Sequence, residues 1–124
     1  MLFLCLFGGD HILKVNILGT EYKILFKTEE EEPFLKTCDG FCDRSRKEIV
    51  VAEMQPNPDI YQVDVDWYKK KVMRHEVLHA FLHESGLEEN SNDVKMWARN
   101  EEMVDWIAIQ FPKILKAYKS LNCL

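Results

Sequence analysis

Residues Val72–Gly86, VMRHEVLHAFLHESG, form the stretch that decides the fold. Asp64 or Asp66, a few residues upstream, can cap a helix that runs through this stretch, because a short acidic side chain accepts hydrogen bonds from the first free N–H groups. Gly86 is a natural position for the left-handed residue that ends a helix. The sequence therefore predicts one long helix in the middle of the chain.

Three histidines recur on this helix at intervals of four residues: His75, His79 and His83. Residues four apart lie on one face, about 6 Å apart along the axis, so His75 and His79 can reach one Zn²⁺. His83 is excluded as a further ligand, because eight residues rise about 12 Å, whereas nitrogens that share a zinc lie within roughly 3.5 Å of each other. We interpret His83 as a surface or cleft-edge histidine. Glu76 lies about 100° around the helix from His75, which suits it to hold a zinc-bound water.

A catalytic zinc takes three protein ligands, so a further ligand has to come from another helix. The segment Arg99–Trp106, RNEEMVDW, offers one. Glu101 and Asp105 share a helical face, so Glu101 can supply a carboxylate oxygen while Asp105 accepts the distal N–H of a liganding histidine. Glu102, on the neighbouring face, is the rival ligand, and we favour Glu101 because only Glu101 shares a face with Asp105.

The motif HEVLH (His75–His79), followed by NEEMVD (Asn100–Asp105), resembles the gluzincins, which are thermolysin-like metallopeptidases with a second motif N-E-x-x-x-D. The resemblance implies one zinc ion per chain. It also implies that the zinc ligands are His75, His79 and Glu101. By the same resemblance, Glu76 is the general base and Asp105 supports a liganding histidine.

The short gap between the two motifs is similar to that of small single-domain gluzincins and ImmA-type phage peptidases. The chain also looks like short phage and prophage proteins that carry a G-[FY]-C-D hairpin before the H-E-x-x-H helix, here GFCD, Gly40–Asp43. This wider likeness covers most of residues 15–115 and implies a minimal zincin-like domain.

The motif predicts hydrolysis of peptide bonds by a zinc-activated water, with Glu76 as general base. A zinc hydrolase of another substrate class, such as an amidase or deacetylase, and a non-enzymatic interaction domain with a zinc site remain alternatives. The strand Glu48–Ala52 is expected either to offer an open edge to a peptide or to be an ordinary core strand. Four residues are candidates for a group that stabilises the oxyanion: Tyr61, Tyr68, His83 and Arg99. The sequence does not rank them.

The rest of the chain predicts an α+β fold. Two short strands around Gly19-Thr20, a strand before a polar turn at Asp43–Lys47, and an apolar strand after it predict a small antiparallel β-sheet. A second helix is expected to start near Ser91–Asp93, with Val104 and Ala108 facing the first helix, and Pro112 is expected to divide it from a last helix.

Length and composition predict one globular domain over residues 1–124, with residues 1–10 as an ill-defined start or an extra strand. The run MLFLCLF has no preceding basic residue and no cleavage site, so we expect no signal peptide, and no segment reaches the length of a membrane span. The net charge of −5 argues against direct nucleic-acid or membrane binding. The four scattered cysteines predict reduced thiols in a cytoplasmic protein: Cys5, Cys38, Cys42 and Cys123.

Overall fold

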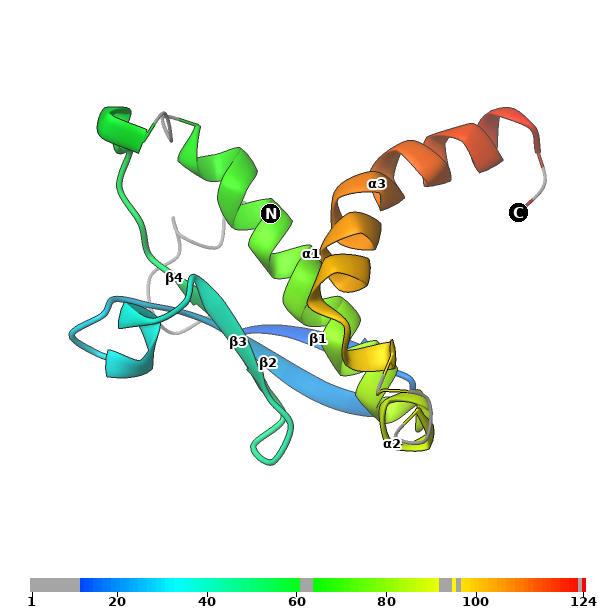
Figure 1. Cartoon of the computed structure of the whole chain (residues 1–124), viewed down its shortest axis with the longest axis horizontal. Helices are drawn as coiled ribbons and strands as arrows, with labels where there is room; N and C mark the ends of the chain where they lie inside the picture. Colours follow the sequence, from blue (N-terminus) through cyan, green and yellow to red (C-terminus); the bar gives the residue numbers. More distant parts are fainter. Residues whose placement is uncertain (1–11, 61–63, 92–94, 96, 123) are drawn as a thin grey trace.

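The computed structural model describes residues 12–60, 64–91, 95, 97–122 and 124, and it has a mixed sheet against which one long helix packs (Figure 1). The strands are β1 (Leu13–Ile17), β2 (Thr20–Lys27), β3 (Gly40–Asp43) and β4 (Glu48–Ala52). The α-helices are α1 (Val65–Glu84), α2 (Leu87–Asn90) and α3 (Glu101–Ser120). Short 3-10 helices occupy Pro33–Lys36 (η2), Pro58–Ile60 (η3) and Trp97–Arg99 (η5).

The strand order is β1-β2-β4-β3, and the sheet is mixed rather than antiparallel as predicted. Two antiparallel hairpins, β1–β2 and β3–β4, follow from their local turns; in the first turn Leu18 and Gly19 both have positive φ, 51° and 96°. The hairpins join through β2 and β4, which run parallel with Ile24 opposite Ile49. The antiparallel prediction fails at this pairing because it joins segments far apart in the sequence, and no turn specifies it.

Helix α1 covers one face of the sheet and closes the main core. The sheet contributes Ile17, Tyr22, Ile24, Ile49 and Val51, and α1 contributes Val72 and Ala80. The helix is capped by Asp64, whose side chain accepts from the N–H of Trp67, and Gly86 follows it with φ 83°. Both predicted helix limits are therefore confirmed.

Helix α3 lies against α1 through Val104 and Ala108, which are 0% and 2% exposed. The predicted start near Ser91–Asp93 is wrong: α3 begins at Glu101, and the Asn100 Oδ1 atom accepts from the N–H of Met103 at 2.7 Å. Asn100 therefore serves as the cap, whereas the Ser91 hydroxyl donates back to Glu88 O at the end of α2.

The predicted break at Pro112 is also wrong, because α3 continues through Pro112 to Ser120. Proline costs a helix one hydrogen bond, since it has no N–H for the carbonyl four residues earlier. That carbonyl belongs to Ala108, and it accepts instead from Arg74 Nε on α1 at 2.6 Å. The second half of α3 then extends away from α1 (Figure 1).

In the described residues, no helix combines the length and apolar character needed to cross a membrane. The predictions for residues 1–10, for Tyr61, for Asn92 and Asp93, and for Cys123 concern positions outside the described residues.

Candidate metal centre

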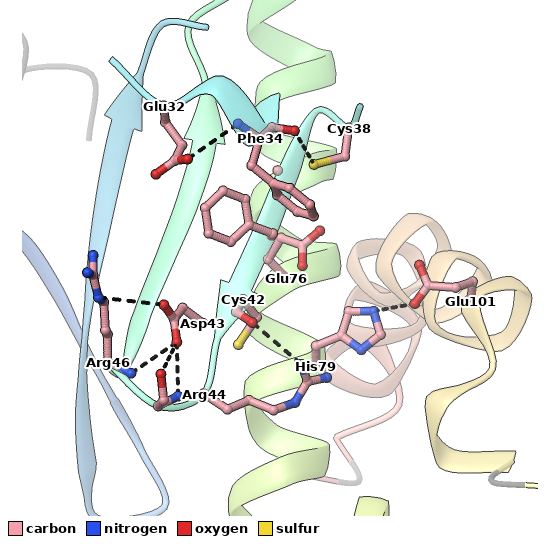
Figure 2. A pocket seen from close by; sticks show the side chains of 13 residues that line it. Glu32, Phe34, Cys38, Cys42, Asp43, Arg44, Arg46, Glu76, His79 and Glu101 are labelled. Carbon is pink, nitrogen blue, oxygen red and sulfur yellow. Dashed lines mark hydrogen bonds and ion pairs between the residues drawn. The ribbon is translucent and has the colours of Figure 1, made fainter. Parts of the chain in front are cut away.

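The candidate ligands from α1 and α3 meet beside the sheet. His75 and His79, one turn apart on α1, bring their Nε2 atoms to 3.2 Å. Glu101, the first residue of α3, places Oε1 2.7 Å from His79 Nε2 (Figure 2). Its Oε2 atom lies 3.3 Å from His75 Nε2. One ligand atom from each of the three residues lies within 4.8 Å of the other two. Glu102, the rival ligand, is exposed and has no part in this group.

These separations suit a shared metal ion. Two atoms bonded to one zinc at 2.0–2.1 Å in a tetrahedral arrangement lie about 3.4 Å apart. Two imidazole nitrogens and a carboxylate oxygen are also the donor types of catalytic zinc sites. The group around His75 contains three candidate ligand residues among the described ones, which is the number of protein ligands in a catalytic zinc site.

Asp105, one turn after Glu101, lies behind His75. Its Oδ1 atom is 3.1 Å from His75 Nδ1 and 2.7 Å from Lys71 Nζ. The hydrogen bond from Lys71 lowers the pKa of the Asp105 carboxyl, and the contact with His75 lowers it further. An ionised Asp105 favours the His75 tautomer that carries its proton on Nδ1, which leaves the Nε2 lone pair directed at Glu101 and His79. Sequence reasoning placed Asp105 here but missed Lys71.

Glu76 lies beside the ligand group without joining it. Its Oε2 atom is 4.0 Å from His75 Nε2, and the residue is 8% exposed. Burial raises the pKa of Glu76 to about 7; the neighbouring carboxylate of Glu101 adds to this shift and His75 opposes it. A carboxyl group with such a pKa can take up and release a proton near neutral pH.

A cleft of about 880 Å³ opens from these residues along strand β3 (Figure 2). Strand β3 is one of the two edge strands of the sheet, whereas β4 pairs with strands on both sides. The alternative of an open edge at Glu48–Ala52 is therefore wrong, and that segment is the core strand. A methyl group on Gly40 would lie 2.8 Å from Val72 Cγ1 and 2.9 Å from Val50 O, so only glycine allows β3 to come this close to α1.

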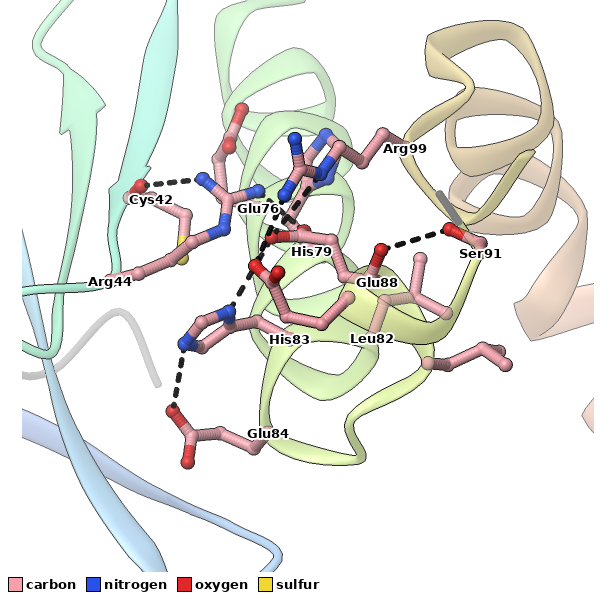
Figure 3. Close-up of polar contacts among 12 residues, drawn as sticks. Cys42, Arg44, Glu76, His79, Leu82, His83, Glu84, Glu88, Ser91 and Arg99 are labelled. Carbon is pink, nitrogen blue, oxygen red and sulfur yellow. Dashed lines mark hydrogen bonds and ion pairs between the residues drawn. The ribbon is translucent and has the colours of Figure 1, made fainter. Parts of the chain in front are cut away.

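Four further polar residues form a cluster, of which only Arg44 lines the cleft: Arg44, His83, Glu88 and Arg99 (Figure 3). Glu88 is 1% exposed; Arg44 Nη2 donates to it at 2.8 Å, and Arg99 Nε lies 3.6 Å from its other oxygen. His83 Nδ1 is 3.4 Å from Glu88 Oε1, so His83 faces this carboxylate and lies apart from the ligand group. Burial raises the pKa of Glu88, but the two arginines dominate and lower it overall.

Arg44 and Glu88 were missed by sequence reasoning. Arg44 lies in the polar turn after GFCD, and a turn residue gives no signal that its side chain reaches a buried partner. Of the four oxyanion candidates, Tyr68 donates a hydrogen bond to Asp39, and Arg99 contacts Glu88 and Glu89.

Cys38 and Cys42 are free thiols, as predicted, and burial raises the pKa of Cys42 to about 12. At that pKa the Cys42 sulfur stays protonated near neutral pH. Comparisons of the chain with protein-family models, curated proteins and solved structures return no match.

Proposed function

We propose that this chain is a zinc-dependent metallopeptidase with a minimal zincin-like architecture of the gluzincin type. The observation that carries the proposal is the convergence of His75, His79 and Glu101 within 4.8 Å, next to a buried Glu76 and an open cleft. In this proposal His75, His79 and Glu101 hold one Zn²⁺, and Asp105 orients His75.

The chemistry follows from the ligand set and from Glu76. A bound zinc supplies Lewis-acid chemistry, which lowers the pKa of water and polarises a carbonyl group. Glu76 takes a proton from the attacking water as the new C–O bond forms. It returns that proton to the amine nitrogen as the C–N bond breaks, so the carboxylate is regenerated at the end of each cycle.

The shape of the cleft favours a peptide over a small amide. Ala52 N donates to Asp39 O at 2.9 Å, which marks Asp39 and Ala52 as a hydrogen-bonded pair. Because such pairs alternate along an antiparallel ladder, the N–H and C=O groups of Gly40 and Cys42 face away from β4. An extended peptide can add to this edge as a further strand if its N–H replaces the 3.4 Å contact that Arg44 Nη1 makes with the Cys42 carbonyl oxygen. An amidase or deacetylase for small substrates would be better served by a deep, closed pocket.

The test combines metal analysis with proteolysis. We expect one zinc per purified wild-type chain, and we expect the wild type to cleave an unfolded protein such as reduced casein. Glu76→Gln should retain the zinc but lose this cleavage. Glu101→Gln should lose zinc, and Glu102→Gln, its matched neighbour, should keep it. His83→Ala should also keep zinc. Zinc with no cleavage would favour the non-enzymatic alternative, and chains without stoichiometric zinc would contradict the proposal.

A further inference from the structure

Arg44 is a fixed cation at the end of the cleft that holds Glu76 and His79 (Figure 2). Its guanidinium donates from Nη2 to Glu88 at 2.8 Å and from Nη1 to the carbonyl oxygen of Cys42 at 3.4 Å. The side chain remains 35% exposed although one end is anchored on a buried carboxylate. Arg44 therefore presents charge to the cleft from a defined position.

Glu88 provides the anchor. Burying a carboxylate is costly unless cations and hydrogen bonds compensate it, and here Arg44 and Arg99 contact its two oxygens. Arg99 also pairs with Glu89, through Nη2 at 3.2 Å, so the spare donor capacity of the cluster lies on Arg44, whose Nη1 makes only the 3.4 Å contact with Cys42 O (Figure 3). Arginine donors in a rigid planar fork are well matched to a further carboxylate.

The contact with Cys42 fixes where Arg44 acts along strand β3. Gly40 lies beside the reacting region, since a Cβ there would be 3.5 Å from Glu76 Cγ. Cys42 is two residues further on, which is about 6–7 Å along an extended strand. A peptide that adds antiparallel to β3 runs in the opposite direction, so its residues nearest Arg44 are those on the N-terminal side of the bond at Glu76.

The other carboxylates of the cleft wall are already engaged. Asp43 Oδ1 accepts from the N–H groups of Ser45 and Arg46, and Glu32 accepts from the N–H of Phe34. Glu76 and Glu101 belong to the candidate metal centre. These hydrogen bonds fix the Asp43 and Glu32 carboxylates without removing their charge, and Arg46 Nε, 3.9 Å from Asp43 Oδ2, offsets part of the charge of Asp43. Arg44 is therefore the cation of the cleft wall that is anchored on a buried carboxylate and still partly exposed to an acidic side chain of a substrate.

We propose that Arg44 is a specificity residue that binds an Asp or Glu side chain of the substrate, within two residues on the N-terminal side of the bond that is cleaved. This inference rests on the proposed peptidase function. Glu88 acts through Arg44 and is a positioning residue.

The experiment uses the full zinc-loaded chain and a peptide library made by digesting a bacterial proteome, with cleavage sites read by mass spectrometry. We expect Asp and Glu to be enriched one or two residues before the cleaved bond. Matched peptides with Glu or Gln at that position then give a ratio of kcat/KM, expected to be about tenfold or more in the wild type. Arg44→Gln should bring this ratio close to one, and Arg44→Lys should restore part of it.

Two controls separate this role from a general charge effect and from unfolding. Arg46→Gln makes the same charge change in the same turn, but the Arg46 side chain is 71% exposed and 3.9 Å from its partner Asp43, so the ratio should stay at the wild-type value. Arg44→Gln combined with Glu88→Gln removes the cation without leaving a buried unpaired carboxylate, and it should also bring the ratio close to one.

The outcomes distinguish the inference from the proposed function. Cleavage without acidic enrichment, or a ratio unchanged in Arg44→Gln, overturns the inference and leaves the peptidase function intact. An equal loss in Arg46→Gln also overturns it, because the preference would then reflect the overall charge of the turn. A zinc-loaded chain that cleaves no peptide contradicts the peptidase function, and the inference falls with it.

Discussion

Arg74 on α1 donates a hydrogen bond from Nε to the main-chain oxygen of Ala108 on α3 over 2.6 Å. The acceptor is the carbonyl that Pro112 leaves without its usual helical partner. One side chain thus repairs a helix defect and ties α3, which carries Glu101, to α1, which carries His75 and His79. This relationship explains how α3 continues through a proline.

Replacing Arg74 should therefore cost more stability in the presence of Pro112 than in its absence. We expect Arg74→Met to lower the free energy of unfolding by about 1–2 kcal/mol, because a buried carbonyl loses its donor. In a Pro112→Ala background the new N–H can bond to Ala108 O, and the same change should cost about 1 kcal/mol less. Urea titrations of the four proteins measure this coupling. Equal costs in both backgrounds would show that Arg74 does not serve the freed carbonyl.

Lys71 should control zinc affinity although it contacts no candidate ligand atom. Lys71 and His75 share the Oδ1 atom of Asp105, so removing the ammonium weakens the carboxylate that orients His75. We expect Lys71→Met to weaken zinc binding about 10-fold, at the lower end of the range for such outer groups, and Lys71→Arg to retain most of it. Competition with a chromophoric chelator measures the affinity. Lys69→Met is the matched control, since Lys69 pairs with Glu53 instead; equal effects of the two methionine variants would contradict this role.

Gly40→Ala should loosen strand β3 from helix α1. The added methyl group would approach Val72 Cγ1 at 2.8 Å and Val50 O at 2.9 Å, and such overpacking typically costs about 1–3 kcal/mol. Adding Val72→Ala should recover only part of the loss, because the contact with the Val50 backbone remains. Thermal or urea unfolding measures both variants. A Gly40→Ala protein as stable as the wild type would mean that β3 can move away without cost.

Local signals in the sequence predicted the parts of the fold that depend on neighbouring residues. Asp64, Gly86 and the turn at Gly19 each act through one or two adjacent peptide units, so α1 and the first hairpin were predicted correctly. The spacing of His75 and His79 fixes their common face in the same way. The position of Glu101 beside these histidines could be predicted only indirectly, from the helical face that Glu101 shares with Asp105.

The errors arose where distant segments decide the structure. The parallel pairing of β2 with β4 has no turn of its own, although the unbroken apolar run Ile49–Ala52 is typical of a central strand covered on both faces. Pro112 predicts a helix break, because the local sequence does not show that Arg74 donates a hydrogen bond to the Ala108 carbonyl. The contact between Arg44 and Glu88 joins a turn to a one-turn helix 44 residues later, and no periodicity marks it.

Glu84, the last residue of α1, accepts hydrogen bonds from three groups of the sheet and its turns. Tyr22 Oη and Lys47 Nζ lie 2.7 Å from Oε2, and Thr20 Oγ1 lies 3.0 Å from Oε1. The hydrogen bonds from Lys47 and Tyr22 lower the pKa of Glu84 to about 2. Glu84→Gln should reduce the free energy of unfolding at pH 7 by about 1–2 kcal/mol, because charge-assisted hydrogen bonds are lost at a partly solvated site.

The pH dependence of this loss follows from the direction of the shift. The folded-state pKa of Glu84, about 2, lies below the ordinary value of 4.5, so the stabilisation is fully present above pH 4.5 and is lost as the pH falls toward 2. The difference in unfolding free energy between wild type and Glu84→Gln should therefore be largest near neutral pH and shrink steadily below pH 4.5. Urea titrations at pH 7, 4 and 3, with a chelator in every sample, measure it. Glu21→Gln is the matched control, because the Glu21 side chain is 62% exposed and 3.7 Å from Lys14, and its effect should be small throughout. A difference for Glu84 that stays constant from pH 7 to 3 would show that its charge does not contribute to the stability of the fold.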